Sequence, residues 1–170
     1  MAFKVYVYGP TDEVMVHKVL RYLNKREDVE VVDKREDADV AVAPLLRKFL
    51  SQEEIDMPKY GTLIFHPSLL PRHRGNDAIN WAFHLNEPYT GATWFWCADG
   101  VDAGPICEQE VLAIEPDMGP AKFYQKKVIP SCVKMLGWII DDLERGYVHA
   151  RPQDESNATL EKKLKVPVKE

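Results

Sequence analysis

The chain has 170 residues, of which 45% are hydrophobic and 29% are charged, and this size favours one globular domain with a substantial core. Its net charge of −5 at pH 7 argues against a large nucleic-acid interface, which needs a basic face. The three cysteines are irregularly spaced, and the sequence has neither an N-terminal signal nor an apolar run of membrane-spanning length. We therefore expect a soluble, cytoplasmic protein without a cysteine-rich metal site.

The first half of the chain alternates between predicted strands and helices. Segments 3–8, 29–32 and 40–43, in which apolar residues predominate, predict strands, and a helix from Thr11 to about residue 25 separates the first two. The turn before this helix has no GxGxxG pattern, so we interpret it as a plain strand-to-helix connection. The segment 63–65 is almost entirely apolar, as buried parallel strands tend to be.

The second half adds a helix at 78–85, capped by Asn76 or Asp77, and a β-rich segment at 92–97. A long helix at 122–147 should break or kink near Pro130. This alternation favours an α/β fold with a partly parallel, Rossmann-like sheet flanked by helices. We expect one main domain over residues 1–150 and a polar, loosely held C-terminal tail over 151–170.

The most informative motif is HPSLLPRHRG, at residues 66–75. His66 ends an apolar strand, and the two prolines that follow make the next loop rigid. A basic cluster of Arg72, His73 and Arg74 completes the motif. Taken alone, the motif fits a structural histidine at a strand end as well as it fits a catalytic one.

A second motif, DGVDAGPI at 99–106, follows the β-rich segment. It predicts either an ordinary Asp-Gly turn or a turn that brings backbone groups close to a ligand. We expect the two motifs to meet at the carboxyl ends of adjacent strands. His66 and Asp102 could then form a general acid/base pair, in which the carboxylate holds the ring in one tautomer and favours its protonated form.

These two motifs, with AINW at 78–81, resemble the catalytic domain of the 10-formyltetrahydrofolate-dependent formyltransferases, over roughly residues 37–164. That family includes methionyl-tRNA and glycinamide ribonucleotide formyltransferases, formyltetrahydrofolate deformylases and the hydrolase domain of 10-formyltetrahydrofolate dehydrogenase. The resemblance implies a Rossmann-like formyltransferase fold. The N-terminal half of this chain is short by comparison with family members, which usually carry a longer segment before the catalytic histidine. In those proteins the longer segment often helps to bind the formyl acceptor.

The resemblance implies transfer of a formyl group from 10-formyltetrahydrofolate to an amine. His66 would stabilise the oxyanion and take part in proton transfer, while Asp102 would orient His66, or a bridging water, and accept a proton from the nucleophile. Family transferases usually have an asparagine oxyanion donor two residues before the histidine. This chain has Ile64 at that position, and the hydrolase domain of the dehydrogenase also has isoleucine there.

The resemblance also implies where the folate would bind. Phe49 and Leu50 would form walls around the pterin ring, although core packing at a helix start explains them almost equally well. The loop residues Asp99, Gly100 and Val101 would contact the edge of the pterin.

Four further side chains have two interpretations each. Arg72 and Arg74 either bind an anion, such as the folate glutamate tail or an anionic acceptor, or are solvated loop charges. Sheet packing is favoured over ligand stacking for Trp94 and Trp96. His73 is interpreted as a residue of the loop or the site's rim.

Three functions remain open from the sequence: an N-formyltransferase acting on a small amine, a 10-formyltetrahydrofolate hydrolase, and a folate-binding protein with weak or no catalysis. Retention of both His66 and Asp102 speaks against the third. The acidic charge, and a chain that ends near where a C-terminal RNA-binding domain would begin, make tRNA a poor candidate acceptor. No metal and no membrane partner are expected. The sequence leaves open the acceptor, the oligomeric state and the choice between transferase and hydrolase.

Overall fold

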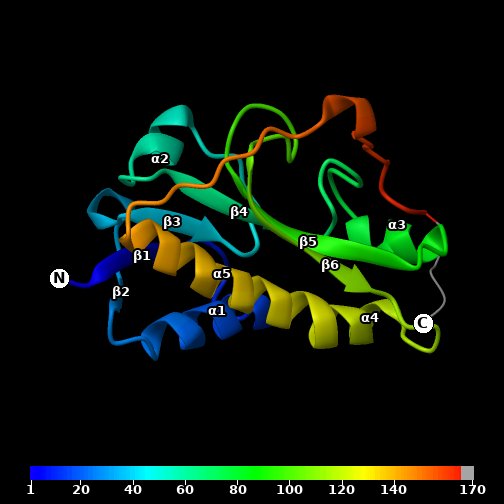
Figure 1. The fold of residues 1–170 in the computed structure, drawn as a ribbon, viewed down its shortest axis with the longest axis horizontal. Coiled ribbons are helices and arrows are strands. Elements are labelled where there is room, and N and C mark those ends of the chain that lie inside the picture. Colours follow the sequence, from blue (N-terminus) through cyan, green and yellow to red (C-terminus); the bar gives the residue numbers. More distant parts are fainter. Residues whose placement is uncertain (166–170) are drawn as a thin grey trace.

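The computed structural model of the chain describes residues 1–165 and centres on a six-stranded sheet with the order β2-β1-β3-β4-β5-β6 (Figure 1). The strands are β1 (Phe3–Val7), β2 (Val29–Val31), β3 (Val40–Ala43), β4 (Thr62–His66), β5 (Tyr89–Trp96) and β6 (Ile106–Ala113). Strands β1 to β4 run parallel, whereas β5 and β6 are each antiparallel to the preceding strand. The predicted partly parallel α/β sheet is confirmed.

Five α-helices flank the sheet within the described residues: α1 (Val14–Asn24), α2 (Gln52–Asp56), α3 (Ala78–His84), α4 (Pro120–Phe123) and α5 (Ile129–Glu144). The expected long helix corresponds to α4 and α5, joined by a π-helical turn at Tyr124–Val128. Pro130 lies at the start of α5. Because proline has no N–H to donate to the preceding turn, the irregularity falls just before it.

Helix α1 begins later than the sequence predicts. Its N-cap is Glu13, without a side-chain hydrogen bond, so the prediction of Thr11 as the cap is wrong. Gly9 has φ +122°, and the amide of Glu13 donates to the carbonyl of Pro10 (3.1 Å). The chain therefore makes a turn before it enters the helix.

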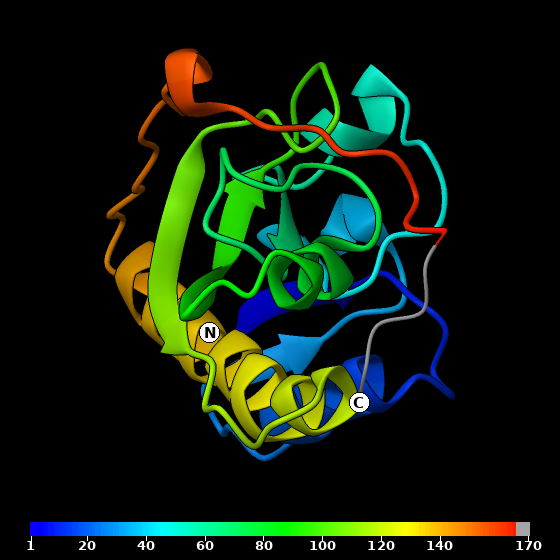
Figure 2. The same cartoon turned by 90° about the vertical axis from the view of Figure 1, so that its right-hand side faces the viewer.

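The two faces of the sheet are covered differently. Helices α1 and α5 cover one face, where the main apolar core lies; the loops and α2 lie on the other side of the sheet (Figures 1 and 2). Trp94 is fully buried in this core and Trp96 packs against it, which confirms the sheet-packing interpretation of both. The second face holds only small apolar clusters, and one residue shared by two of them is Ile64.

The C-terminal segment 151–164, which we call the C-terminal strap, runs across the loops at the top of Figure 2. Its backbone pairs with two distant parts of the chain, Arg151 with Ile106 and Leu160 with Arg74. The amide of Leu164 donates to the Asp77 carboxylate (3.1 Å). The expectation of a loosely held tail is therefore wrong for these residues, because their polar groups bond to protein partners. Residues 166–170 of the predicted tail lie outside the described residues.

Among residues 1–165, no helix has the length and apolar character that crossing a membrane requires. The three cysteines, Cys97, Cys107 and Cys132, are unpaired.

Candidate active site

His66 is the last residue of β4 and is almost fully buried, with 6% of its surface exposed. Because side chains alternate along a strand, Ile64 and His66 share the second face, while Leu63 and Phe65 enter the main core. After Pro67 the chain turns back over this face. The turn is fixed by Ser68, whose carbonyl accepts from the Thr93 hydroxyl (2.7 Å).

The second motif reaches His66 by an unexpected route. Strands β4 and β5 are antiparallel, with His66 opposite Thr93 and Leu63 opposite Trp96. The carboxyl end of β4 therefore lies beside the amino-terminal part of β5, away from the carboxyl end of β5. The prediction that both motifs meet at the carboxyl ends of adjacent strands is therefore wrong. Loop 97–105 folds back along the sheet instead, and a Cβ on Gly104 would stand only 1.7 Å from the Trp96 carbonyl oxygen.

The fold nevertheless brings His66 and Asp102 together. Nδ1 of His66 lies 3.4 Å from Oδ2 of Asp102, and the same oxygen accepts a hydrogen bond from the amide of Gly75 (2.7 Å). Nε2 of His66 lies 2.6 Å from the carbonyl oxygen of His73. Since a carbonyl oxygen only accepts, Nε2 carries a proton and donates it. Nδ1 is therefore the ring nitrogen left for chemistry.

Burial dominates the electrostatics of this pair. It lowers the pKa of His66 below its ordinary value, although the Asp102 carboxylate and the hydrogen bond to the His73 carbonyl act in the opposite direction. The sequence analysis expected the carboxylate to fix the tautomer and favour the protonated ring. In the structure the His73 carbonyl fixes the tautomer, and the neutral ring is favoured. Nδ1 then offers a lone pair beside a carboxylate.

Ile64 presents no hydrogen-bond donor to this face. It is half-buried and packs against two clusters, one around Tyr8 and one around Leu70 and Phe95. Position 64 is thus part of the apolar floor next to His66.

The residues expected to contact a pterin differ in exposure. Phe49 is 97% exposed, which excludes core packing as its explanation, whereas Leu50 packs partly buried against the cluster around Tyr8. The loop residues Asp99, Gly100 and Val101 are all exposed. Folate binding by these five residues stays a prediction.

Both arginines of the first motif are paired with carboxylates. Arg72 donates from Nε to Glu87 (2.8 Å), and Arg74 donates to Glu155 (2.6 Å). Arg74 is only 9% exposed, so the interpretation as a solvated loop charge is wrong for it. Anion binding by either arginine stays a prediction.

His73 lies in the loop, which confirms one of the two expected positions, but it is not a rim residue, because only 1% of it is exposed. Its ring lies between two carboxylates, with Nε2 3.0 Å from Glu87 and Nδ1 2.8 Å from Glu161. Burial alone would raise the pKa of Glu87, but the hydrogen bonds from Arg72 and His73 bring it below its usual value. The residue that fixes the His66 tautomer is thus itself held on both sides.

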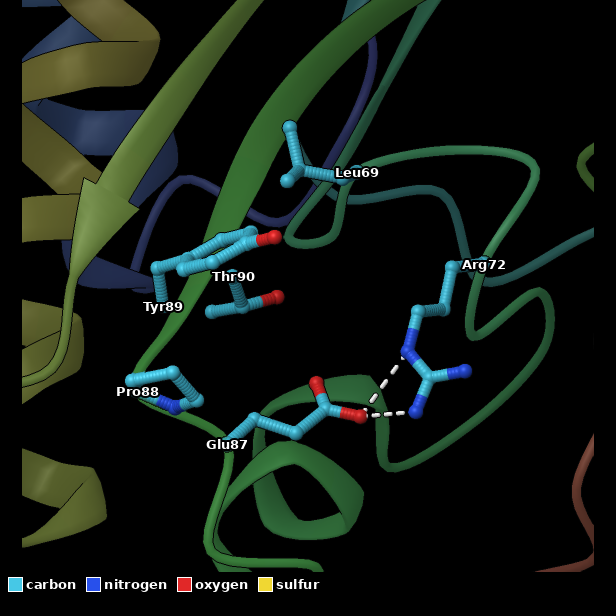
Figure 3. A pocket seen from close by; sticks show the side chains of 6 residues that line it. All are labelled: Leu69, Arg72, Glu87, Pro88, Tyr89 and Thr90. Carbon is cyan, nitrogen blue, oxygen red and sulfur yellow. Dashed lines mark hydrogen bonds and ion pairs between the residues drawn. The ribbon is translucent and has the colours of Figure 1, made fainter.

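A cavity of about 280 Å³ opens beside the first motif (Figure 3). It is lined by Leu69, Arg72, Glu87, Pro88, Tyr89 and Thr90. Figure 3 shows the Arg72–Glu87 ion pair closing one side of it. Since neither His66 nor Asp102 lines this cavity, we locate the candidate site by its reactive groups rather than by the hollow.

Comparison with known proteins shows which family the chain resembles. The family model described as formyl transferase matches residues 8–130, which include both His66 and Asp102. The mitochondrial 10-formyltetrahydrofolate dehydrogenase of Mus musculus is 36% identical over 124 residues, covering 73% of this chain and 13% of the mouse protein. The methionyl-tRNA formyltransferase of Thermotoga neapolitana is 32% identical over 137 residues, covering 81% of this chain and 43% of that protein. The chain thus spans less than half the length of these relatives.

Solved structures show the same fold. HypX from Aquifex aeolicus, in complex with tetrahydrofolic acid, superposes with a TM-score of 0.81 at 23% identity, over 96% of this chain and 30% of that one. The formyltransferase PseJ from Anoxybacillus kamchatkensis, in complex with a formamido sugar nucleotide and tetrahydrofolate, gives a TM-score of 0.73 at 18% identity, over 94% and 86% of the two chains. With the family model matching most of its length, this chain belongs to the formyl transferase family.

Proposed function

We propose that this domain transfers the formyl group of 10-formyltetrahydrofolate to a small amine, with His66 and Asp102 as its catalytic residues. Family membership supports formyl transfer. The observation that carries the proposal is Nδ1 of His66, left free by the bond from Nε2 to His73 and placed 3.4 Å from Asp102. Relatives named for 10-formyltetrahydrofolate and a neighbour solved with tetrahydrofolate support folate as the donor.

The folate supplies the formyl group, and attack by an amine forms a new N–C bond while negative charge develops on the formyl oxygen. A primary amine has two N–H bonds, and Nδ1 of His66 and Oδ2 of Asp102 are adjacent acceptors for them. As the amine attacks, Nδ1 takes one proton, and the Asp102 carboxylate stabilises the resulting imidazolium. Nδ1 then gives this proton to the departing folate nitrogen as the old C–N bond breaks.

Ile64 determines how the negative charge is stabilised. Because this side chain has no donor, the charge developing on the formyl oxygen depends on the protonated Nδ1 of His66 and on whatever backbone amides the bound folate meets. A pterin would rest against Phe49 and Leu50, and its edge would face residues 99–101. The full exposure of the Phe49 ring supports this arrangement, since a bound ring would remove it from water.

Hydrolysis is the second candidate function. Water also has two O–H bonds to donate to the same two acceptors, and the mouse relative is a 10-formyltetrahydrofolate dehydrogenase. The net charge of −5 argues against tRNA as the acceptor. Three unpaired cysteines support a reducing compartment such as the cytoplasm.

The deciding experiment incubates the protein with 10-formyltetrahydrofolate, with and without a panel of amines and amino sugars, and follows tetrahydrofolate and formate. Product that depends on the amine supports the transferase, and formate without amine supports the hydrolase. His66→Asn and Asp102→Asn should each lose most turnover, while His84→Asn, at an exposed histidine, should not. Folate binding without turnover in the wild type would leave only a binding function.

A further inference from the structure

We propose that Gln153 of the C-terminal strap is a positioning residue for the His66–Asp102 pair, joining the loop that follows His66 to the loop that carries Asp102. This inference rests on the proposed function of the pair. Gln153 lies far along the chain from both motifs, yet its side chain is only 9% exposed and sits between them.

The four hydrogen bonds of the Gln153 amide are all made, and the chemistry of its partners fixes its orientation. Nε2 donates to the carbonyl oxygens of Asp102 (2.8 Å) and Gly104 (2.7 Å). Oε1 accepts from Nε (3.1 Å) and Nη2 (2.9 Å) of Arg74. Carbonyls only accept and a guanidinium only donates, so the flipped amide would lose every bond. A buried, fully satisfied amide of this kind specifies one arrangement of its neighbours.

This arrangement joins the loop of Asp102 to the loop that follows His66. In the sequence Arg74 lies between His73 and Gly75. The His73 carbonyl accepts from Nε2 of His66, and the Gly75 amide donates to the Asp102 carboxylate. The Gln153 side chain thus holds the backbone of Asp102, while the Gly75 amide holds the Asp102 side chain.

Asp102 needs such support because its backbone is left-handed, with φ +50°. A non-glycine residue in that region is strained and persists only where its surroundings hold it. Without the Gln153 donors, loop 97–105 would relax, and Oδ2 of Asp102 would move away from Nδ1 of His66. Since displacements of about 1 Å in a catalytic group cost on the order of 100-fold in rate, the loss should appear in turnover.

Two variants test this inference. Gln153→Met keeps the volume but removes all four hydrogen bonds. Gln153→Glu keeps the contact with Arg74 but replaces the two donors to Asp102 and Gly104 by an oxygen. We expect both to lower kcat by about 10- to 100-fold at pH 7.5 with KM for the folate changed less than about threefold. The matched control is Glu155→Gln, which removes the negative charge of the other, exposed partner of Arg74 and should leave kcat unchanged.

A second readout does not need activity. The His66 ring is titrated by NMR in the wild type and both variants, with His66→Asn to assign its signal. The charged and titratable groups facing this ring are Asp102 and His73, with Arg74 acting on Asp102. Because the Asp102 carboxylate favours the protonated ring, its withdrawal should shift the His66 midpoint to lower pH in Gln153→Met. In Gln153→Glu the added carboxylate acts in the opposite direction, so kcat is the deciding readout for that variant.

The two readouts separate the possible outcomes. If the wild type shows no turnover, the proposed function fails and the NMR shift alone decides the positioning role. If Gln153→Met does not fold, Gln153→Glu carries the test, because its carboxylate can still accept the hydrogen bonds from Arg74. Wild-type kcat together with an unshifted His66 midpoint in folded Gln153→Met, or wild-type kcat in Gln153→Glu, would overturn the inference.

Discussion

At His66 one hydrogen bond determines which ring nitrogen stays available. The His73 carbonyl accepts from Nε2, so Nδ1 keeps its lone pair on the side of Asp102, where the proposed mechanism uses it. The neighbouring position on the same face, Ile64, supplies packing instead of a donor.

Ile64→Asn should add an oxyanion donor where family transferases have one. If the rest of the site is preorganised, turnover should rise by up to about 100-fold. The opposing effect is burial of an amide among apolar side chains, which costs roughly 1–3 kcal/mol where it finds no partner. Stability should therefore fall in the free protein and recover partly with bound folate. Single-turnover loss of the formyl group at saturating protein measures the rate. Ile64→Val is the control, and an unchanged rate in folded Ile64→Asn would show that this position does not serve the oxyanion.

The lowered pKa of His66 makes stability depend on pH in a defined direction. Below the ordinary value of 6.5 the unfolded chain binds a proton at this residue while the folded chain does not, so stability falls as the pH falls. The loss continues down to the folded pKa, with a slope of up to about 1.4 kcal/mol per pH unit. When the free energy of unfolding is measured in urea between pH 7.5 and 5, its dependence on pH should be weaker for His66→Asn than for the wild type. His84→Asn should keep the wild-type slope, and equal slopes for all three proteins would contradict the lowered pKa.

At the scale of elements, one arginine links α1 and β2 to α5. Arg26, just after α1, donates through Nη2 to Asp28 (2.5 Å) and Asp141 (2.7 Å), and Glu144 lies 3.6 Å away. The hydrogen bond from Arg26 lowers the pKa of Asp28 to about 2. The three carboxylates cluster around this single guanidinium and would repel one another without it.

Arg26→Met should therefore destabilise the fold, by about 1 kcal/mol, since the pairs are partly exposed and screened. Urea unfolding at low salt measures the difference, and 0.5 M NaCl should reduce it. The part of the wild-type stability that comes from Asp28 is present above its ordinary pKa of 3.8 and is lost as the pH falls towards 2. Arg21→Met, at an exposed arginine of α1, is the matched control. Equal stability of Arg26→Met and Arg21→Met at low salt would contradict the role given to this network.

Strands and helices could be predicted well from the sequence where apolar residues predominate in a short segment. Strands β3 and β4 were recognisable because uninterrupted apolar runs are typical of parallel strands covered on both faces, and β1 was recognisable because only Lys4 interrupts its apolar residues. Strand β6 escaped prediction because Glu108 and Glu110 interrupt its apolar residues at the edge of the sheet. A helix start was expected at Phe49 and Leu50, but α2 begins at Gln52, after a capping box of Ser51 and Glu54 that the spacing alone could have indicated.

At the scale of the whole molecule, the candidate site is assembled from three distant segments. The motifs identified His66 and Asp102 because each lies in a compact, recognisable sequence. Local patterns did not predict the antiparallel step between β4 and β5, nor the strap that crosses both loops. Gln153, Thr159 and Glu161 belong to a polar segment whose composition resembles a loose tail, and only long-range contacts reveal their partners.

The strap should therefore control the mobility of loop 67–75 without being needed for the main core. The Thr159 hydroxyl accepts from the amide of His73 (2.7 Å), and Glu161 holds the His73 ring. The double variant Thr159→Val and Glu161→Leu removes both contacts. Each hydrogen bond contributes roughly 0.5–1.5 kcal/mol, and the charged one contributes more, so amides of this loop should exchange about 10- to 100-fold faster with deuterium.

The core formed by α1, α5 and the covered face of the sheet makes none of these contacts, so its protection should stay the same. Lys162→Gln with Lys163→Gln, at two exposed strap positions, serves as the matched control. Faster exchange confined to loop 67–75 would identify the strap as a local brace of the site. Loss of protection throughout the sheet would instead make the strap part of the global fold, and unchanged exchange in the loop would show that His73 is held without it.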